Sequence, residues 1–209
     1  MHTLFGARGS DSAAAKAALA FCALTFPRVR AALWEAGSDM PALLRVNPLS
    51  QRPTLLLPDG SLMTESAAIR MHLGLQYPAS IRPAACRRAR RLHERRRCAA
   101  WPPIATAPSA SATTLSVAPP WPHPAQDKVR QAARRQSHRY WEMFADGFSA
   151  KPCLGDKNAD ALDILANVVL RWSGTRAHMP QPRLAFAAWM QRASERPRLA
   201  EVFARHLEA

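Results

Sequence analysis

Apolar and polar residues alternate from His2 to Ala7, and this period of two predicts a first β-strand. The run Gly9-Ser10-Asp11-Ser12 follows and leads directly into the alanine-rich stretch AAAKAALAF. Serine and aspartate are preferred just before a helix, and alanine is the strongest helix former. The pattern therefore predicts a helix over about residues 12–24.

The elements that follow complete one small α/β unit within the first 80 residues. Alternation within residues 26–34 predicts a second strand, and a short helix is expected within 37–46. Pro58-Asp59-Gly60 is a turn, because proline fixes φ and glycine accepts a positive φ. It joins expected strands at 54–57 and 61–63, and a helix follows from Thr64 to about Tyr77. The order strand–helix–strand–helix–strand–strand–helix is that of a thioredoxin-like domain.

Helical periodicity returns at Asp127 and continues toward the C-terminus. A first helix is predicted from Asp127 to a stop at Gly147, and a second begins where Asp160 and Asp163 approach a capping box. The second is apolar almost all round, so it is expected to be buried. An amphipathic helix over about 183–193 and a short one after Pro197 complete an all-α second domain.

A segment of different composition separates the two parts. Residues 82–126 contain eight arginines and one acidic residue, so this segment carries half of the net charge of +14. Residues 82–125 contain eight prolines. Prolines at this density break helices. We therefore divide the chain into a domain at 1–80, an irregular basic segment at 81–126 and a helical domain at 127–209.

Cysteine usage and hydropathy exclude several classes of protein. The four cysteines form no CxxC or CxxH pair, so neither a metal site nor a disulfide framework is expected, and Cys22 is predicted to be a small core residue. No apolar run reaches the roughly 18 residues of a membrane helix. The first twelve residues lack the charged and apolar regions of a signal peptide, which favours the cytoplasm and no membrane partner.

Two short motifs suggest recognition of a peptide ligand. A cis bond between Arg52 and Pro53 would turn the backbone of Arg52 outward toward an extended ligand, whereas a trans bond would make Pro53 a plain strand-entry residue. Glu65-Ser66 opens a helix, whose free N–H groups attract a carboxylate. The glutamate suits an ammonium group, so the pair suits an α-amino acid head; the alternative is ordinary helix capping.

Taken in order, NPLSQRPTL, Pro58-Asp59-Gly60 and TESAAI resemble the N-terminal domain of bacterial glutathione S-transferases. The resemblance resumes at about 127–175, in DKVRQAARR, RYWEMF, ALDI and LRWSGTRAH. It implies a thioredoxin-like domain followed by an all-helical domain. It also implies glutathione as co-substrate, attack of the glutathione thiolate on a small electrophile in detoxification, and a homodimer.

The same resemblance implies roles for individual residues. Gln51, Arg52 and Pro53 would bind the cysteinyl backbone of glutathione, and Glu65 and Ser66 its γ-glutamyl group. A hydroxyl after the first strand would bind the sulfur, with Ser10 as the first candidate and Ser12 as the second; the alternative for both is helix capping.

Three residues depart from the family pattern. Ser50 stands where glycine is usual, and Arg52 stands where valine is common. Asp11 places a negative charge near the proposed thiolate, which opposes ionisation of the thiol.

In that family a long helix should follow residue 80, and residues 82–125 show none of its character. An amino-acid sequence rich in arginine, proline and alanine is typical of a GC-rich gene that is read in a wrong frame. A shifted frame through residues 102–117 permits AANCYSAISVSDYPER, which resembles the expected helix and turn. The hypothesis is that the reading frame slips near residue 81 and returns near 126.

Two other functions remain open from the sequence. One is a basic module that binds nucleic acid or another anion through residues 82–97, although nucleic acid is the less expected partner because few aromatic residues accompany the arginines. The other is a non-catalytic interaction protein that keeps the glutathione S-transferase fold alone.

Overall fold

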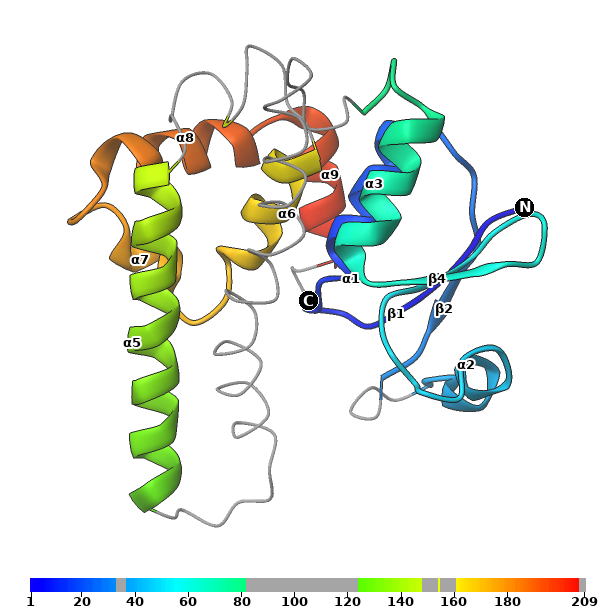
Figure 1. Cartoon of the computed structure of the whole chain (residues 1–209), viewed down its shortest axis with the longest axis horizontal. Helices are drawn as coiled ribbons and strands as arrows, with labels where there is room; N and C mark the ends of the chain where they lie inside the picture. Colours follow the sequence, from blue (N-terminus) through cyan, green and yellow to red (C-terminus); the bar gives the residue numbers. More distant parts are fainter. Residues whose placement is uncertain (33–36, 82–123, 148–153, 155–160, 207–209) are drawn as a thin grey trace.

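The computed structural model describes residues 1–32, 37–81, 124–147, 154 and 161–206 (Figure 1). A four-stranded sheet has the order β2-β1-β3-β4, from strands β1 (Thr3–Gly6), β2 (Arg28–Arg30), β3 (Thr54–Leu56) and β4 (Leu62–Thr64). β1 runs parallel to β2 and antiparallel to β3, and β3 and β4 form an antiparallel hairpin. The predicted thioredoxin-like order of elements is confirmed for these residues.

Alternate residues of the central strands face two different cores. Leu4 and Leu55 pack beneath helices α1 (Ser12–Phe21) and α3 (Ser66–Gln76). Phe5 faces the opposite side, where helix α2 (Met40–Val46) contributes Leu43. This alternation is the period of two that the sequence showed, and it places α1 and α3 together on one face of the sheet.

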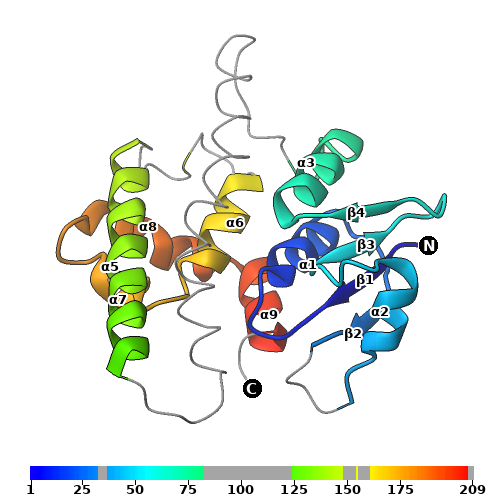
Figure 2. The same ribbon diagram turned by 60° about the horizontal axis from the view of Figure 1, so that its bottom comes forward.

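Helix α1 belongs to two hydrophobic cores at once. Ala15, Ala18 and Leu19 face the sheet core, whereas Ala13, Ala14 and Ala17 pack against the C-terminal helices. α1 contacts α6 (Ala161–Val169) and α9 (Pro197–His206), and both lie beside it in Figures 1 and 2. The small methyl side chains allow these helices to approach closely.

The remaining helices form the outer part of the helical region. They are α5 (Pro124–Gly147), α7 (Thr175–His178) and α8 (Leu184–Ser194), and they lie on the side away from the sheet (Figure 1). Their core contains Trp141, Phe144, Phe186 and Trp189. Within the part of the chain that the structure describes, no helix is long and apolar enough to cross a membrane.

Several boundaries differ from the sequence expectation. α1 ends at Phe21 instead of about residue 24, because Ala23 has a left-handed φ of 53° and the chain turns there. β2 is three residues long, and α7 was not predicted at all. Cys22 lies in the sheet core as predicted.

Several sequence hypotheses fall outside the described residues. They are the proposed basic anion-binding segment and frame slip (within residues 82–123), the cap at Asp160 and the end of the strand predicted to reach residue 34.

Candidate functional site

The candidate residues meet at one end of the sheet because of the strand register. Phe5 of β1 pairs with Thr54 of β3, and Thr54 pairs with Thr64 of β4. The chain therefore leaves β1, enters β3 and leaves β4 at the same edge. The Ser10–Ser12 turn follows β1, Arg52-Pro53 precedes β3, and Glu65-Ser66 follows β4.

The turn after β1 separates the two candidate serines. Ser12 is fully buried, and its hydroxyl accepts a hydrogen bond from Ala7 N at 3.1 Å and donates to Ala7 O at 3.0 Å. Ser10 is partly exposed; its Oγ donates to Ala7 O at 2.8 Å and also contacts the Ser12 hydroxyl. Ser12 thus fastens the turn to the start of α1, which leaves Ser10 as the serine that a ligand can approach.

Close packing explains the position of Ser12. Gly6 ends β1 directly opposite Ser12, and a Cβ added at Gly6 would lie 2.6 Å from Ser12 Cβ and 2.7 Å from Ser12 Oγ. The absence of a side chain at Gly6 therefore sets how near the N-terminus of α1 comes to the strand.

The loop before β3 is held by its own polar residues. The Arg52–Pro53 bond is cis, the condition on which the sequence hypothesis depended. The buried Thr54 hydroxyl donates to Gln51 O at 2.8 Å and accepts from Asn47 Nδ2 at 2.9 Å. The Arg52 guanidinium donates to Ala31 O at 3.1 Å, so the side chain ties this loop to the end of β2.

Glu65 and Ser66 occupy the junction of β4 and α3. Glu65 is exposed and has a left-handed φ of 65°, whereas Ser66 is only 4% exposed. The Arg70 side chain, 3% exposed, donates through Nε to Ser66 O at 2.7 Å. Sequence reasoning missed Arg70; an arginine four residues after Ser66, and so on the same face of the helix, was the signal.

Asp11 links the first and third parts of the site. Its carboxyl group comes close enough to Ser66, Glu65 and Arg70 of α3 for these residues to affect its pKa. Burial raises the pKa of Asp11 to about 6; the Glu65 charge acts in the same direction, and the Ser66 hydrogen bond and the Arg70 charge oppose it. The carboxylate that was expected to disfavour a thiolate thus faces the Glu65-Ser66 pair.

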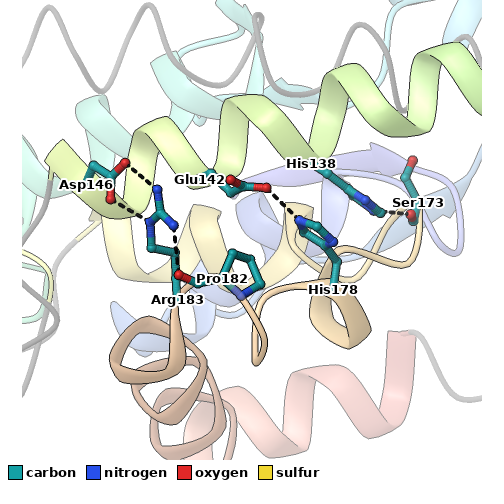
Figure 3. Close-up of polar contacts among 7 residues, drawn as sticks. All are labelled: His138, Glu142, Asp146, Ser173, His178, Pro182 and Arg183. Atoms are coloured by element: carbon teal, nitrogen blue, oxygen red, sulfur yellow. Dashed lines mark hydrogen bonds and ion pairs between the residues drawn. The ribbon is translucent and has the colours of Figure 1, made fainter.

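A second polar cluster joins α5 to α7 and the turn before α8 (Figure 3). His138 and His178 stack with ring centroids 4.2 Å apart, and His178 Nε2 lies 2.7 Å from Glu142 Oε1. Arg183 makes a two-pronged contact with Asp146, with N···O distances of 2.6 and 2.7 Å. Among the described residues, no three His, Cys, Asp or Glu side chains are placed to hold a metal ion. The contacts of this cluster join α5 to α7 and to the turn before α8.

Comparison with known proteins finds a family model that matches the first part of the chain and a fold shared with solved structures. Residues 2–74 match the model of the glutathione S-transferase N-terminal domain. No curated protein matches the chain. This match and the shared fold described below confirm the resemblance to bacterial glutathione S-transferases that the sequence motifs indicated.

Solved structures match along almost the whole chain. A sphingomonad glutathione S-transferase complexed with glutathione is 23% identical, with a TM-score of 0.75 and coverage of 99% of this chain and 100% of that chain. An enzyme from Xylella fastidiosa is 18% identical, with a TM-score of 0.78 and coverage of 99% and 98%. One from Methylobacterium radiotolerans, in complex with glutathione sulfonate, is 20% identical, with a TM-score of 0.75 and coverage of 100% and 95%. The thioredoxin-like domain followed by a helical domain is their shared fold.

Proposed function

We propose that the chain binds glutathione and joins it, through its thiolate sulfur, to a small electrophile. The premises are the match of residues 2–74 to the glutathione S-transferase N-terminal domain and the two-domain fold that the chain shares with bacterial glutathione S-transferases. The observation that carries the proposal is the strand register, which gathers Ser10, Arg52-Pro53 and Glu65-Ser66 at one sheet edge. A ligand as extended as a tripeptide needs several contact points along one edge, and this arrangement supplies them. The neighbouring complexes with glutathione and glutathione sulfonate agree with this ligand class.

Each end of glutathione has a partner of matching chemistry. The exposed Glu65 carboxylate suits the α-ammonium group of the γ-glutamyl residue, and the Ser66 hydroxyl and N-terminus of α3 suit its carboxylate. The backbone of Gln51 and Arg52, together with Pro53, would receive the cysteinyl residue. The sulfur would then lie toward Ser10, at the N-terminal end of α1.

The proposed reaction begins with ionisation of the thiol. Its proton passes to solvent, and the Ser10 hydroxyl turns from Ala7 O to donate to the thiolate sulfur. The sulfur then bonds to an electrophilic carbon, and the leaving group departs with its bonding electron pair. A hydrogen bond to a charged group contributes about 1.5–3 kcal/mol, so Ser10→Ala should lower kcat about tenfold to hundredfold.

Retention on immobilised glutathione tests the binding step. The double variant Glu65→Ala/Ser66→Ala should lose the retention that the unmodified protein shows, whereas Asp127→Ala, an exposed acid on α5, should keep it. Failure of the unmodified protein to be retained would refute the proposal. Retention without turnover of chlorodinitrobenzene would leave glutathione binding standing and refute the transfer step.

A further inference from the structure

Arg52 has a charged side chain where valine is common in the family pattern, and the proposed function uses only its backbone. The side chain is partly buried. Its Nη1 donates to Ala31 O at 3.1 Å and lies 4.0 Å from Met40 Sδ. Ala31 follows β2 and Met40 begins α2, so the guanidinium lies between the end of that strand and the start of that helix.

The order of the strands gives the direction in which a bound tripeptide would run. The proposed function assigns the γ-glutamyl residue to Glu65-Ser66, which follow β4, and the cysteinyl residue to the loop before β3. Because the sheet order is β2-β1-β3-β4, a ligand that passes from β4 to β3 continues toward β1 and β2. β2 runs parallel to β1 and therefore ends at the same edge of the sheet. The third residue of the ligand, glycine, would thus approach the strand end where the Arg52 guanidinium lies.

Glutathione carries a second carboxylate on this glycyl residue. An extended peptide advances about 3.5 Å per residue, so that carboxylate would come within reach of a long side chain that starts at position 52. A guanidinium suits a carboxylate because it can form two parallel N–H···O bonds with it. It has five N–H donors, so it can hold Ala31 O and a carboxylate at the same time.

We propose that the Arg52 side chain binds the glycyl carboxylate of glutathione and makes the site selective for ligands with a free C-terminal carboxylate. The inference rests on the proposed function and adds a specificity-determining residue to it. The hydrogen bond to Ala31 O orders the long side chain before the ligand arrives, so less conformational entropy is lost on binding.

The charged residues Asp39 and Arg30 lie near the same strand end, where Asp39 N donates to Arg30 O at 2.7 Å, but both side chains are placed differently. The Asp39 carboxylate caps α2 and accepts a backbone hydrogen bond from that helix at 2.9 Å. Val29 packs on the side of α2, so Arg30, the next residue of the strand, faces the other side of the sheet. Arg30 therefore provides a matched control for Arg52, with the same charge on the opposite face.

The experiment compares two ligands that differ only at the glycyl end. Calorimetric titration at neutral pH measures the dissociation constants of S-methylglutathione and of its glycine amide, in which a neutral carboxamide replaces the carboxylate. The unmodified protein, Arg52→Gln, Arg52→Met and Arg30→Met are each titrated with both ligands. Arg52→Gln keeps a donor for Ala31 O and Arg52→Met keeps an apolar stem, so one uncharged variant can be studied if the other does not fold.

The expected result is a preference for the acid over the amide that depends on Arg52. The unmodified protein and Arg30→Met should bind the acid about tenfold to hundredfold more tightly than the amide, which is the contribution of a hydrogen bond to a charged group. Both Arg52 variants should bind the two ligands with nearly equal affinity. Damage to the fold alone would weaken both ligands by the same factor and leave their ratio unchanged, so the ratio reports the contact itself.

Three outcomes would contradict these claims. The same ratio in all four proteins, or equal binding of acid and amide by the unmodified protein, would overturn the inference and leave the proposed function intact. Loss of the ratio in Arg30→Met as well as in the Arg52 variants would assign the preference to the general positive charge of this edge and also overturn the inference. No binding of either ligand by the unmodified protein would overturn the proposed function and the inference with it.

Discussion

Replacing Gly6 by alanine should destabilise the protein through a single contact. The added Cβ would lie 2.6 Å from Ser12 Cβ, where carbon atoms normally stay about 3.5–4.0 Å apart. Neither Ser12 nor the Gly6 backbone can move away without breaking hydrogen bonds. Ser12 is anchored to Ala7 by hydrogen bonds in both directions, and Ala31 N donates to Gly6 O at 3.0 Å. Overpacking of this kind costs about 1–3 kcal/mol, so Gly6→Ala should lower the free energy of unfolding by that amount.

A double-mutant cycle isolates the contact. Urea unfolding is measured for glycine and alanine at position 6, each with serine, alanine or glycine at position 12. Ser12→Gly removes the Cβ that Gly6→Ala would meet, so the cost of Gly6→Ala should fall by about 1–2 kcal/mol in that background. Ser12→Ala keeps the Cβ and is the matched control, in which most of the cost should remain. An equal cost in all three backgrounds would refute the reasoning.

Asp11→Asn should raise the free energy of unfolding at pH 8 by up to about 3 kcal/mol and change it little near pH 4. The native pKa of about 6 lies above the ordinary 3.8, so the stability contributed by the protonated carboxyl is lost as pH rises through 6. Equal gains at both pH values in urea unfolding would contradict this. Ser50 has a left-handed φ of 51°, so Ser50→Gly should raise the free energy of unfolding by about 0.5–1 kcal/mol and with it the melting temperature. A lower melting temperature would count against backbone strain at Ser50. The pKa of His138 is lowered, first by burial and then by the charges of His178 and Arg134. The hydrogen bond to the Ser173 carbonyl and the Glu142 charge act in the opposite direction. The free energy of unfolding should therefore fall as pH drops below 6.5, and it should fall less in His138→Gln. Urea unfolding from pH 7.5 to 5.5 measures both, and parallel pH profiles for the two proteins would refute the role given to His138. Independent resequencing of the gene should reveal two compensating shifts flanking residues 82–125, and a clean frame there would dismiss the frame hypothesis.

The sequence allowed the sheet and its order of elements to be predicted because the central strands alternate clearly. Leu4 and Phe5 face opposite cores, and so do Leu55 and Leu56. The end of α1 was not predictable in the same way, since the left-handed residue there is Ala23, a residue type that rarely marks a helix end. α7 is four residues long, too short for any periodic pattern to appear.

The candidate site was predicted as separate pieces, and the structure adds how they are joined. Ser10, Arg52-Pro53 and Glu65-Ser66 were identified from local motifs and a family resemblance, and strand register explains why they meet. The effect of the α3 residues Glu65, Ser66 and Arg70 on the pKa of Asp11 could not be predicted, because it depends on how α1 packs on α3. Ser10 and Ser12 look alike in sequence, and only burial distinguishes them.

The alanine face of α1 also determines when during synthesis the site can be finished. Ala13, Ala14 and Ala17 share a core with Leu199 and Val202 of α9, the last helix that the structure describes. A ribosome releases that helix long after Ser10 has left the exit tunnel. The helix that follows the Ser10 turn is therefore fully packed only after the last part of the chain has been made. A nascent chain halted short of α9 would leave exposed to water the part of α1 that α9 covers.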